Sequence, residues 1–415
     1  MIDLDKHWES KNKMTEQKYI ALIDCDSFFV SCERKINPRL CGKPVCVVSG
    51  DRGCVVARSI EAKEMGIPMG HPLFMAKKEF PDAIYINSNL YLYSQISEQV
   101  MNLLRQFSPM VEVYSIDEAF VDLTGLAKHY KKNYYNLALS IREIVAQEIG
   151  IPVSVGVSRT KTLAKLASDK SKTTVNHVYI AGRCGITRLL KSSEIGEVWG
   201  IGRNLEPKLR GHGIYTAYDY AEKNDTWLKS RFGKLGLELK YELLGNQIHK
   251  ISDVIKPPKS IMDTKSFPEF STDINYLKNE LMIHIHSACR KLRKANCKCK
   301  TIGVIIKTKD FKTFCEKENL EHATNFEFEI SELAIPILEK MFNRNEIYRS
   351  VGILLENFKP CDNEQRSFFD NSERREKNEK LAKSLDKLEA KFGRNIIKTG
   401  FIGKVDYKQD FISKN

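Results

Sequence analysis

The chain has 415 residues, which is too long for one ordinary domain and predicts about two to four domains. Hydrophobic residues make up 42% of it, which excludes a largely disordered protein. The formal net charge of +13 predicts an anionic partner, either nucleic acid or a membrane surface, with simple solubility charge as the alternative.

The first part of the chain predicts an α+β domain that is interrupted by an insert at about 28–83. The domain begins with the apolar strand "YIALIDCD" (19–26), and apolar residues at helical spacing predict a helix from Asn89. The stretch "VEVYSIDEAFVDLTG" (111–125) predicts a pair of strands. A helix over 134–149, the strand "VSVGVS" and the helix "KTLAKLASDK" follow. Without the insert, this is the order of a split βαβ, ferredoxin-like sandwich.

The middle segment carries a candidate contact to a nucleic-acid backbone. "VWGIGRNLEPKLRGHGI" (198–214) holds a Gly-Ile-Gly turn between short helices, which presents backbone N–H groups to a phosphate. The segment resembles a helix-hairpin-helix, and a plain helical turn is the alternative. The residues expected at the backbone are Gly200, Gly202, Arg203 and Lys208.

A second α+β domain is predicted at about 261–358, after the stiff linker "KPPKS" (256–260). It repeats the order of the first domain, with "KSFPEF" extended and a long helix ending near Lys294. The strands "TIGVIIKT" and "NFEFEI", a helix over 333–342 and the strand "SVGILLENF" follow.

Cysteine usage and the lack of long apolar runs predict a cytosolic protein. Eleven cysteines are scattered without a CxxC pair, a pattern typical of free thiols in a reducing compartment. Residues 1–17 are polar and lack the apolar core of a signal peptide, and no apolar run reaches membrane-spanning length. No membrane partner is therefore expected.

Three carboxylates are candidates for a metal site. Asp117 and Glu118 are neighbours, and in a flat strand adjacent side chains point to opposite faces. If the chain turns there, as in a tight hairpin, both acids can lie at one edge of the sheet beside Asp24 of the first strand. With the carbonyl of Cys25 they would form an all-oxygen site, which suits magnesium bridging substrate phosphates. Two such ions would support phosphoryl transfer; plain turn residues are the alternative.

Five motifs occur in the order found in Y-family DNA polymerases. They are "LIDCDSFFVSCE", "GCVVARSIEAKEMGI", "VEVYSIDEAFVDLTG", "VSVGVSRTKTLAKLASDKSK" and "VWGIGR". From about residue 19 onward the chain resembles this family, and most closely its UmuC-type branch, the catalytic subunit of bacterial DNA polymerase V. The resemblance implies error-prone translesion synthesis in the DNA damage (SOS) response, with two Mg²⁺ ions, or Mn²⁺ in their place, serving transfer of dNTPs to a primer 3′ end.

The resemblance also implies a multidomain α+β architecture shaped like a right hand and located in the bacterial cytoplasm at the nucleoid. Its expected parts are a polar extension (1–17), a ferredoxin-like palm (18–27 and 84–180), small fingers (28–83), a helical thumb with the helix-hairpin-helix (181–255), the linker (256–260), an α+β little finger that binds DNA (261–358) and a tail (359–415).

Carried over residue by residue, the resemblance assigns catalysis and metal binding to Asp24, Asp117 and Glu118, with Cys25 as the carbonyl donor. Phe29 matches the steric gate, an aromatic ring under the sugar that leaves no room for a 2′-hydroxyl. Phe28 joins the nucleotide-binding set, although from the residues alone both phenylalanines are typical of a core.

Two lysines, Lys63 and Lys172, match positions that bind the triphosphate, where an ammonium group offers a point charge. Ile60 stands where other branches of the family have a tyrosine. Arg58 or Ser59 could replace the missing contact, and the sequence leaves that choice open.

Positive charge is concentrated in the predicted little finger. Between His286 and Lys312 the chain has nine Lys or Arg and one acid, Asp310. This surface is expected to neutralise phosphates of primer–template DNA. The candidate contacts are Arg290, Lys291, Arg293, Lys294, Lys298, Lys300, Lys307 and Lys309.

The tail holds "EQRSFFD", which resembles a sliding-clamp-binding peptide. Gln365 would enter a polar pocket of the clamp, while Phe368 and Phe369 fill an apolar one. Beyond this peptide, a predicted helix and an extended segment resemble the UmuC-type C-terminus, which could hold a processed UmuD-like subunit or a recombinase filament.

Two other functions compete with the polymerase. A metal-dependent nuclease would need a water-activating His or Lys beside the acids and would not need the gate at Phe29. A non-catalytic scaffold binding DNA and clamp would have no use for three mutually repelling carboxylates.

Overall fold

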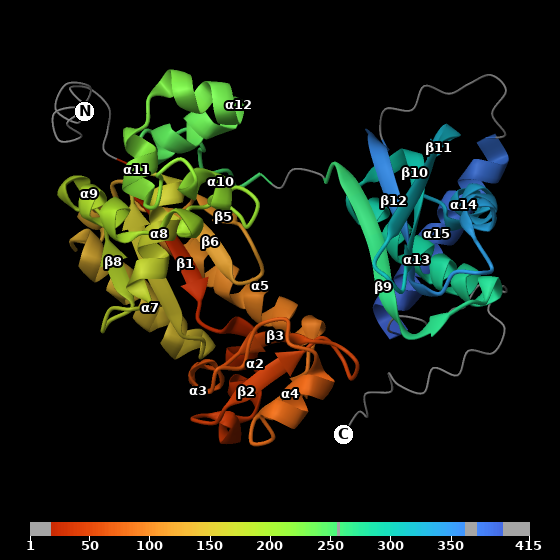
Figure 1. The fold of residues 1–415 in the computed structure, drawn as a ribbon, viewed down its shortest axis with the longest axis horizontal. Coiled ribbons are helices and arrows are strands. Elements are labelled where there is room, and N and C mark those ends of the chain that lie inside the picture. The colour runs from red at the N-terminus through yellow and green to blue at the C-terminus, as the bar shows by residue number, and fades with distance from the viewer. Residues whose placement is uncertain (1–17, 255–257, 362–371, 393–415) are drawn as a thin grey trace. The chain divides into compact units, whose positions relative to one another are not determined.

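The computed structural model describes residues 18–254, 258–361 and 372–392 (Figure 1). The chain divides into two compact units, Met1–Ile255 and Lys256–Asn415. The predicted N-terminal extension and the expected clamp residues lie outside the described residues. Among the described residues, no helix is long and apolar enough to cross a membrane.

A five-stranded sheet of order β5-β6-β1-β7-β8 organises the first unit. Its central strand β1 (Ile20–Cys25) is antiparallel to both β6 (Glu118–Asp122) and β7 (Val153–Ser158). The edges are β5 (Val111–Val113) and β8 (Val178–Ile180). Because β1 is buried along its whole length, its sequence is apolar except for Asp24. Without β8, the strand order is that of a ferredoxin-like sandwich, and this prediction is confirmed.

Helices cover both faces of this sheet. Alternate residues of β1 enter different cores: Ala21 packs with the helix pair on one face, and Leu22 packs with Ala164 of the helix on the other. The helices concerned are α5 (Leu90–Phe107) and α7 (Tyr134–Ile149) on the first face, α8 (Lys161–Ser171) on the second, and the short α6 (Leu126–His129) after β6.

The insert after β1 builds its own three-stranded sheet of order β3-β2-β4. Its elements are α2 (Phe28–Ile36), η1 (Pro38–Leu40), β2 (Val45–Val48), β3 (Val55–Arg58), α3 (Ile60–Glu64), α4 (Leu73–Glu79) and β4 (Ile84–Asn87). Strand β4 runs parallel to β2 and pairs with it along its whole length. The boundary expected at residue 83 is therefore too early, because β4 belongs to the insert and not to the larger sheet.

The helical segment that follows β8 packs around its own core, which it shares with α8. It consists of α9 (Arg183–Ser192), η2 (Ile195–Glu197), α10 (Glu206–Arg210), α11 (Ala217–Glu222) and α12 (Asp225–Leu243). The fully buried Glu242 accepts hydrogen bonds from the backbone N–H groups of Thr162, Ile248 and His249. This carboxylate ties the end of α12 to the start of α8.

The second unit has the predicted βαββαβ order, followed by the predicted tail helix. Its elements are β9 (Ser260–Ser271), α13 (Ile274–Lys294), β10 (Cys297–Thr308), β11 (Thr313–Thr324), α14 (Glu327–Met341), β12 (Tyr348–Pro360) and α15 (Ser372–Phe392). The sheet order is β11-β10-β12-β9, so here the last strand is central and not the first.

One element of this unit differs from the prediction. "NFEFEI" was expected to be a strand, but it leads into α14, whose first turn contains Glu327 and Glu329. Acids at a helix N-terminus are favourable because they face the positive end of the helix dipole. The second strand of the hairpin is instead the polar β11, an edge strand that is exposed along most of its length and shows no apolar alternation.

Candidate active site

The two neighbouring acids do not share a strand. Glu118 is the first residue of β6, and Asp117 lies in the turn before it. The N–H groups of Tyr114 and Ser115 both donate to the Glu118 carbonyl, at 3.0 and 3.1 Å. The carbonyl of Asp117 accepts the N–H of Cys25 at 2.9 Å, which holds this turn against the end of β1. Strand alternation therefore does not separate the two acids.

Asp24 lies directly opposite Glu118 in the antiparallel register of β1 and β6, so the two side chains share a face. Asp24 is only 9% exposed. Burial raises the pKa of its carboxyl to about 6; the ammonium of Lys172 opposes this rise, and the charges of Glu118 and Asp117 add to it. The three acids are thus close enough to repel one another.

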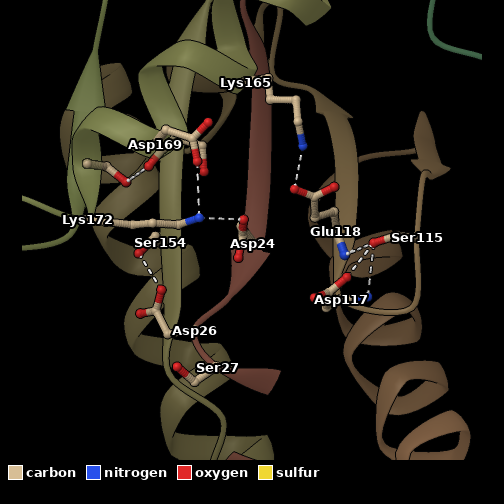
Figure 2. Close-up of polar contacts among 12 residues, drawn as sticks. Asp24, Asp26, Ser27, Ser115, Asp117, Glu118, Ser154, Lys165, Asp169 and Lys172 are labelled. Carbon is tan, nitrogen blue, oxygen red and sulfur yellow. Dashed lines mark hydrogen bonds and ion pairs between the residues drawn. The ribbon is translucent and has the colours of Figure 1, made fainter. Parts of the chain in front are cut away.

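Two lysines from α8 and its C-cap neutralise part of this charge (Figure 2). Lys172 Nζ donates to Asp24 Oδ2 at 2.8 Å, and Lys165 Nζ donates to Glu118 Oε1 at 2.6 Å. Lys172 also contacts Asp169, at 3.2 Å. Burial lowers the pKa of Lys172, but the two carboxylates outweigh burial, and the pKa is raised overall.

Asp117 is held within its own turn. Its Oδ1 accepts a short hydrogen bond of 2.5 Å from Ser115 Oγ, and that same oxygen of Ser115 accepts the backbone N–H groups of Asp117 and Glu118. Figure 2 shows Asp117 beside Ser115 and Glu118 turned towards Lys165. The hydroxyl of Ser115 therefore orders the turn that carries both acids.

The donor set fits a hard divalent cation, although the side chains are not yet arranged around one. Three carboxylates from adjoining segments offer only oxygen ligands, and two lysines do not cancel their three negative charges. Among the described residues, no three His, Cys, Asp or Glu side chains lie close enough to hold a metal ion as they stand. Each acid instead faces its own partner, so a cation would compete with Lys165 and Lys172.

The two candidate phenylalanines lie in different surroundings. Phe28 is 3% exposed and belongs to the core of the first unit. Phe29 is half-buried and stacks on Tyr93, with ring centroids 4.4 Å apart. The Tyr93 hydroxyl donates to Glu33 at 2.6 Å, so the ring under Phe29 is itself anchored.

The nucleotide-binding candidates of the insert also lie in different surroundings. Lys63 reaches back to the residue after Asp26, where its Nζ lies 3.3 Å from Ser27 Oγ. The guanidinium of Arg58 donates to the carbonyl of Ile67. Ser59 is fully buried and caps α3, with its hydroxyl bonded to backbone groups of the insert. The structure thus brings Lys63 to the end of β1 and commits Ser59 to the insert.

The candidate DNA contacts in the helical segment lie at its surface. Gly200 has a φ of 93°, a left-handed conformation that favours glycine, and it forms the predicted turn. Gly202, Arg203 and Lys208 are exposed.

The basic candidates of the second unit do not form one exposed surface. Lys294, Lys300 and Lys309 are exposed, whereas Lys307 is half-buried. Lys298 is 7% exposed, and the Arg293 side chain is 9% exposed. The prediction that these last two lie on an open basic surface is wrong.

The tail helix α15 explains why two of these arginines are covered. Arg293 pairs with Asp386 at 2.7 Å, and Arg290 pairs with Glu389 at 3.3 Å; both acids are in α15. Arg293 also pairs with Glu327. Lys291 contacts Asp263 of β9 at 2.6 Å.

Sequence reasoning missed Lys165 and Ser115. Lys165 and Lys172 are seven residues apart, which places both on one face of a helix and could have signalled a paired role. Ser115 lies two residues before Asp117, the spacing at which a hydroxyl commonly bonds the following backbone.

The comparisons with known proteins agree with this arrangement. The impB/mucB/samB family matches residues 23–169, and its C-terminal domain matches residues 258–368. Protein UmuC of Salmonella typhimurium is 33% identical over 91% of this chain and 92% of its own length. DNA polymerase IV of Brucella melitensis is 29% identical over 92% and 85%.

Solved structures show the same fold. A Y-family DNA polymerase chimera of Dbh and Dpo4 matches with a TM-score of 0.71 and 26% identity, covering 82% of this chain and 99% of that chain. An insertion ternary complex of Dbh DNA polymerase matches with a TM-score of 0.55 and 27% identity over the same shares.

The fold and these relatives define a DNA-directed DNA polymerase of the Y family, the class that carries out translesion synthesis in response to DNA damage. Within that class, the chain belongs to the impB/mucB/samB family.

Proposed function

We propose that Asp24, Asp117 and Glu118, with the carbonyl of Cys25, hold two Mg²⁺ ions at which dNTPs are added to a primer 3′ end, and that Mn²⁺ can replace Mg²⁺. The observation that supports this site best is the register that sets Asp24 opposite Glu118, with the turn of Asp117 bonded to the end of β1. When bound, the ions would neutralise phosphate charge and activate the attacking hydroxyl.

The chain's own residues position the nucleotide. Lys172 is held at Asp24 and Lys63 is held at Ser27, so two ammonium groups lie near the end of β1. An incoming triphosphate would draw both towards its phosphates, where they steady the charge that develops on the leaving pyrophosphate. Because Lys172 then leaves Asp24, nucleotide binding frees a carboxylate for the cation. Arg58 is the further candidate for a phosphate contact.

Phe29 acts as the sugar gate, and its stacking on Tyr93 holds the ring in place. We expect Phe29→Ala to raise the ratio of ribonucleotide to deoxyribonucleotide insertion roughly 10- to 100-fold, because the space for a 2′-hydroxyl opens. Single-nucleotide insertion with matched rNTP and dNTP measures this ratio. Phe29→Tyr keeps the bulk and serves as the matched control; an unchanged ratio in Phe29→Ala would rule out the gate.

Primer extension by the purified chain tests the proposed function. On a primed template with four dNTPs, we expect extension with Mg²⁺ or Mn²⁺, none after chelation with EDTA, and full recovery when Mg²⁺ is restored. On a template with one abasic site, products should extend beyond the lesion. Extension that persists in EDTA would exclude the metal site.

The other proposed partners bind outside this site. Primer–template DNA would contact the turn at Gly200 and the exposed lysines of the second unit. Tail residues 362–371 would bind a sliding clamp, and the chain beyond them a processed UmuD-like subunit or a recombinase filament. These contacts imply a cytoplasmic, nucleoid-associated protein.

A further inference from the structure

A ladder of alternating rings and cations crosses one end of the sheet of the second unit. The Arg349 guanidinium lies 5.7 Å from the ring centroid of Phe270 and 4.1 Å from that of Phe311, and Lys307 Nζ lies 5.2 Å from the Phe311 centroid. The four residues come from β9, β12, the β10–β11 turn and β10. The register brings these segments together, since Tyr348 pairs with both Thr308 and Ser271. In Figure 1, β12 lies between β10 and β9.

The aromatic members of this ladder are open to solvent. Phe311 is 64% exposed and Phe270 is 49% exposed. A cluster of exposed rings on a folded unit indicates a contact surface more often than isolated apolar residues do. The rings lie outside the core of the second unit, so hydrophobic burial does not account for them.

The backbone conformation at Phe311 also indicates a role for its ring. Its φ is 66°, in the left-handed region that glycine adopts easily and a bulky residue adopts at a cost. The turn is closed by hydrogen bonds from Phe311 N–H to the Thr308 carbonyl and from Thr308 N–H to the Lys312 carbonyl. Glycine would adopt this conformation at less cost, so the turn geometry does not account for a large ring at this position.

The positive charge around the ladder indicates which kind of ligand would bind there. Beside Lys307 and Arg349, the turn carries Lys309 and Lys312 against the single acid Asp310. Rings interleaved with cations are the combination that binds single-stranded nucleic acid, because bases stack on rings while the cations meet the phosphates. A protein partner would be expected to need fewer like charges around its apolar contact.

We propose that the Phe270–Arg349–Phe311–Lys307 ladder is a binding site for single-stranded DNA. A phosphate draws Lys307 away from the Phe311 ring, and a base stacks on the face that Lys307 leaves. Arg349 stays between the two rings, where its charge can meet a neighbouring phosphate. The proposal rests on the proposed function only in that such a polymerase meets unpaired template.

The test is binding of fluorescently labelled oligo(dT) to the full-length chain, without dNTPs and in EDTA, so that the result does not depend on catalysis. Phe311→Gly removes the ring and relaxes the turn, so it should keep the melting temperature while weakening oligo(dT) binding roughly tenfold. Binding of a duplex of equal length should change less than about twofold, because phosphate contacts remain.

Two further variants separate stacking from general apolar contact. Phe311→Leu should bind oligo(dT) as weakly as Phe311→Gly, and Phe311→Trp should restore binding and show quenching of its fluorescence. Phe314→Ala is the matched control. Phe314 is 50% exposed on the same hairpin but pairs with Ile306, whose side chain enters the core beneath the helices.

If Phe311→Gly lost as much affinity for the duplex as for oligo(dT), the proposal would be overturned, since a change in charge contacts alone would explain both losses. Full binding by Phe311→Leu would also overturn it, as would an unchanged affinity in Phe311→Gly, which would leave a protein partner as the better occupant.

Discussion

Replacing Asp24 or Asp117 by asparagine, or Glu118 by glutamine, is expected to lower primer extension at least about a thousandfold. Each amide keeps the shape of the side chain but removes the negative charge that a divalent cation needs. The register that places Asp24 opposite Glu118 means that either change affects the same site. The assay is extension of a labelled primer with Mg²⁺ and four dNTPs.

The Asp24→Asn chain should remain folded. Asp24 has a pKa of about 6 against an ordinary 3.8, so its ionisation makes folding less favourable as the pH rises through that interval. Above pH 6 a neutral asparagine removes this penalty, and the melting temperature should not fall below that of the wild type. A large fall would assign Asp24 a structural role through Lys172.

Asp122→Asn is the matched control for the acids. Asp122 ends the same strand as Glu118, but it pairs with Ile20 at the other end of β1, away from the site. Its variant should extend primers as the wild type does. Wild-type rates from Asp24→Asn would place the active site elsewhere. No extension by any chain, with salt-sensitive DNA binding, would indicate a scaffold or an enzyme that needs a partner subunit.

Gly156→Ala is expected to destabilise the first unit by about 3 kcal/mol or more. Gly156 lies in β7, and a Cβ atom there would come within 1.9 Å of Ser168 N and 2.4 Å of Ala167 C, both backbone atoms of α8. Backbone cannot move aside as a flexible side chain can, so α8 would shift as a whole. Since α8 carries Lys165, activity should fall with stability.

Urea unfolding of the full-length chain measures this effect, and Gly185→Ala in α9 is its control. A Cβ at Gly185 would meet only the Ile180 carbonyl, at 3.7 Å, which is an ordinary contact. Alanine inside a helix should leave stability unchanged or raise it by up to about 1 kcal/mol. A Gly156→Ala chain as stable as the control would contradict the close packing of β7 against α8.

The amino-acid pattern alone predicts the class of protein and the order of most of its elements. Five ordered motifs predicted the family, and the apolar run of β1 and the periodicity of α5 and α7 predicted the sandwich, because these segments are buried locally and show it in their pattern. The polar edge strand β11 was missed for the same reason, since an exposed strand carries no apolar pattern.

Which charged side chains pair with one another follows from the folded structure and not from the sequence pattern. The predicted sheet suggested that Asp117 could lie beside Asp24. Three ion pairs, however, depend on packing between segments that are distant in the sequence: Lys172 with Asp24, Lys165 with Glu118, and Arg293 with Asp386. In the sequence, a charged side chain that faces water cannot be told from one that faces a buried partner. The two differ in burial and in neighbouring charge, and both of these arise only on folding.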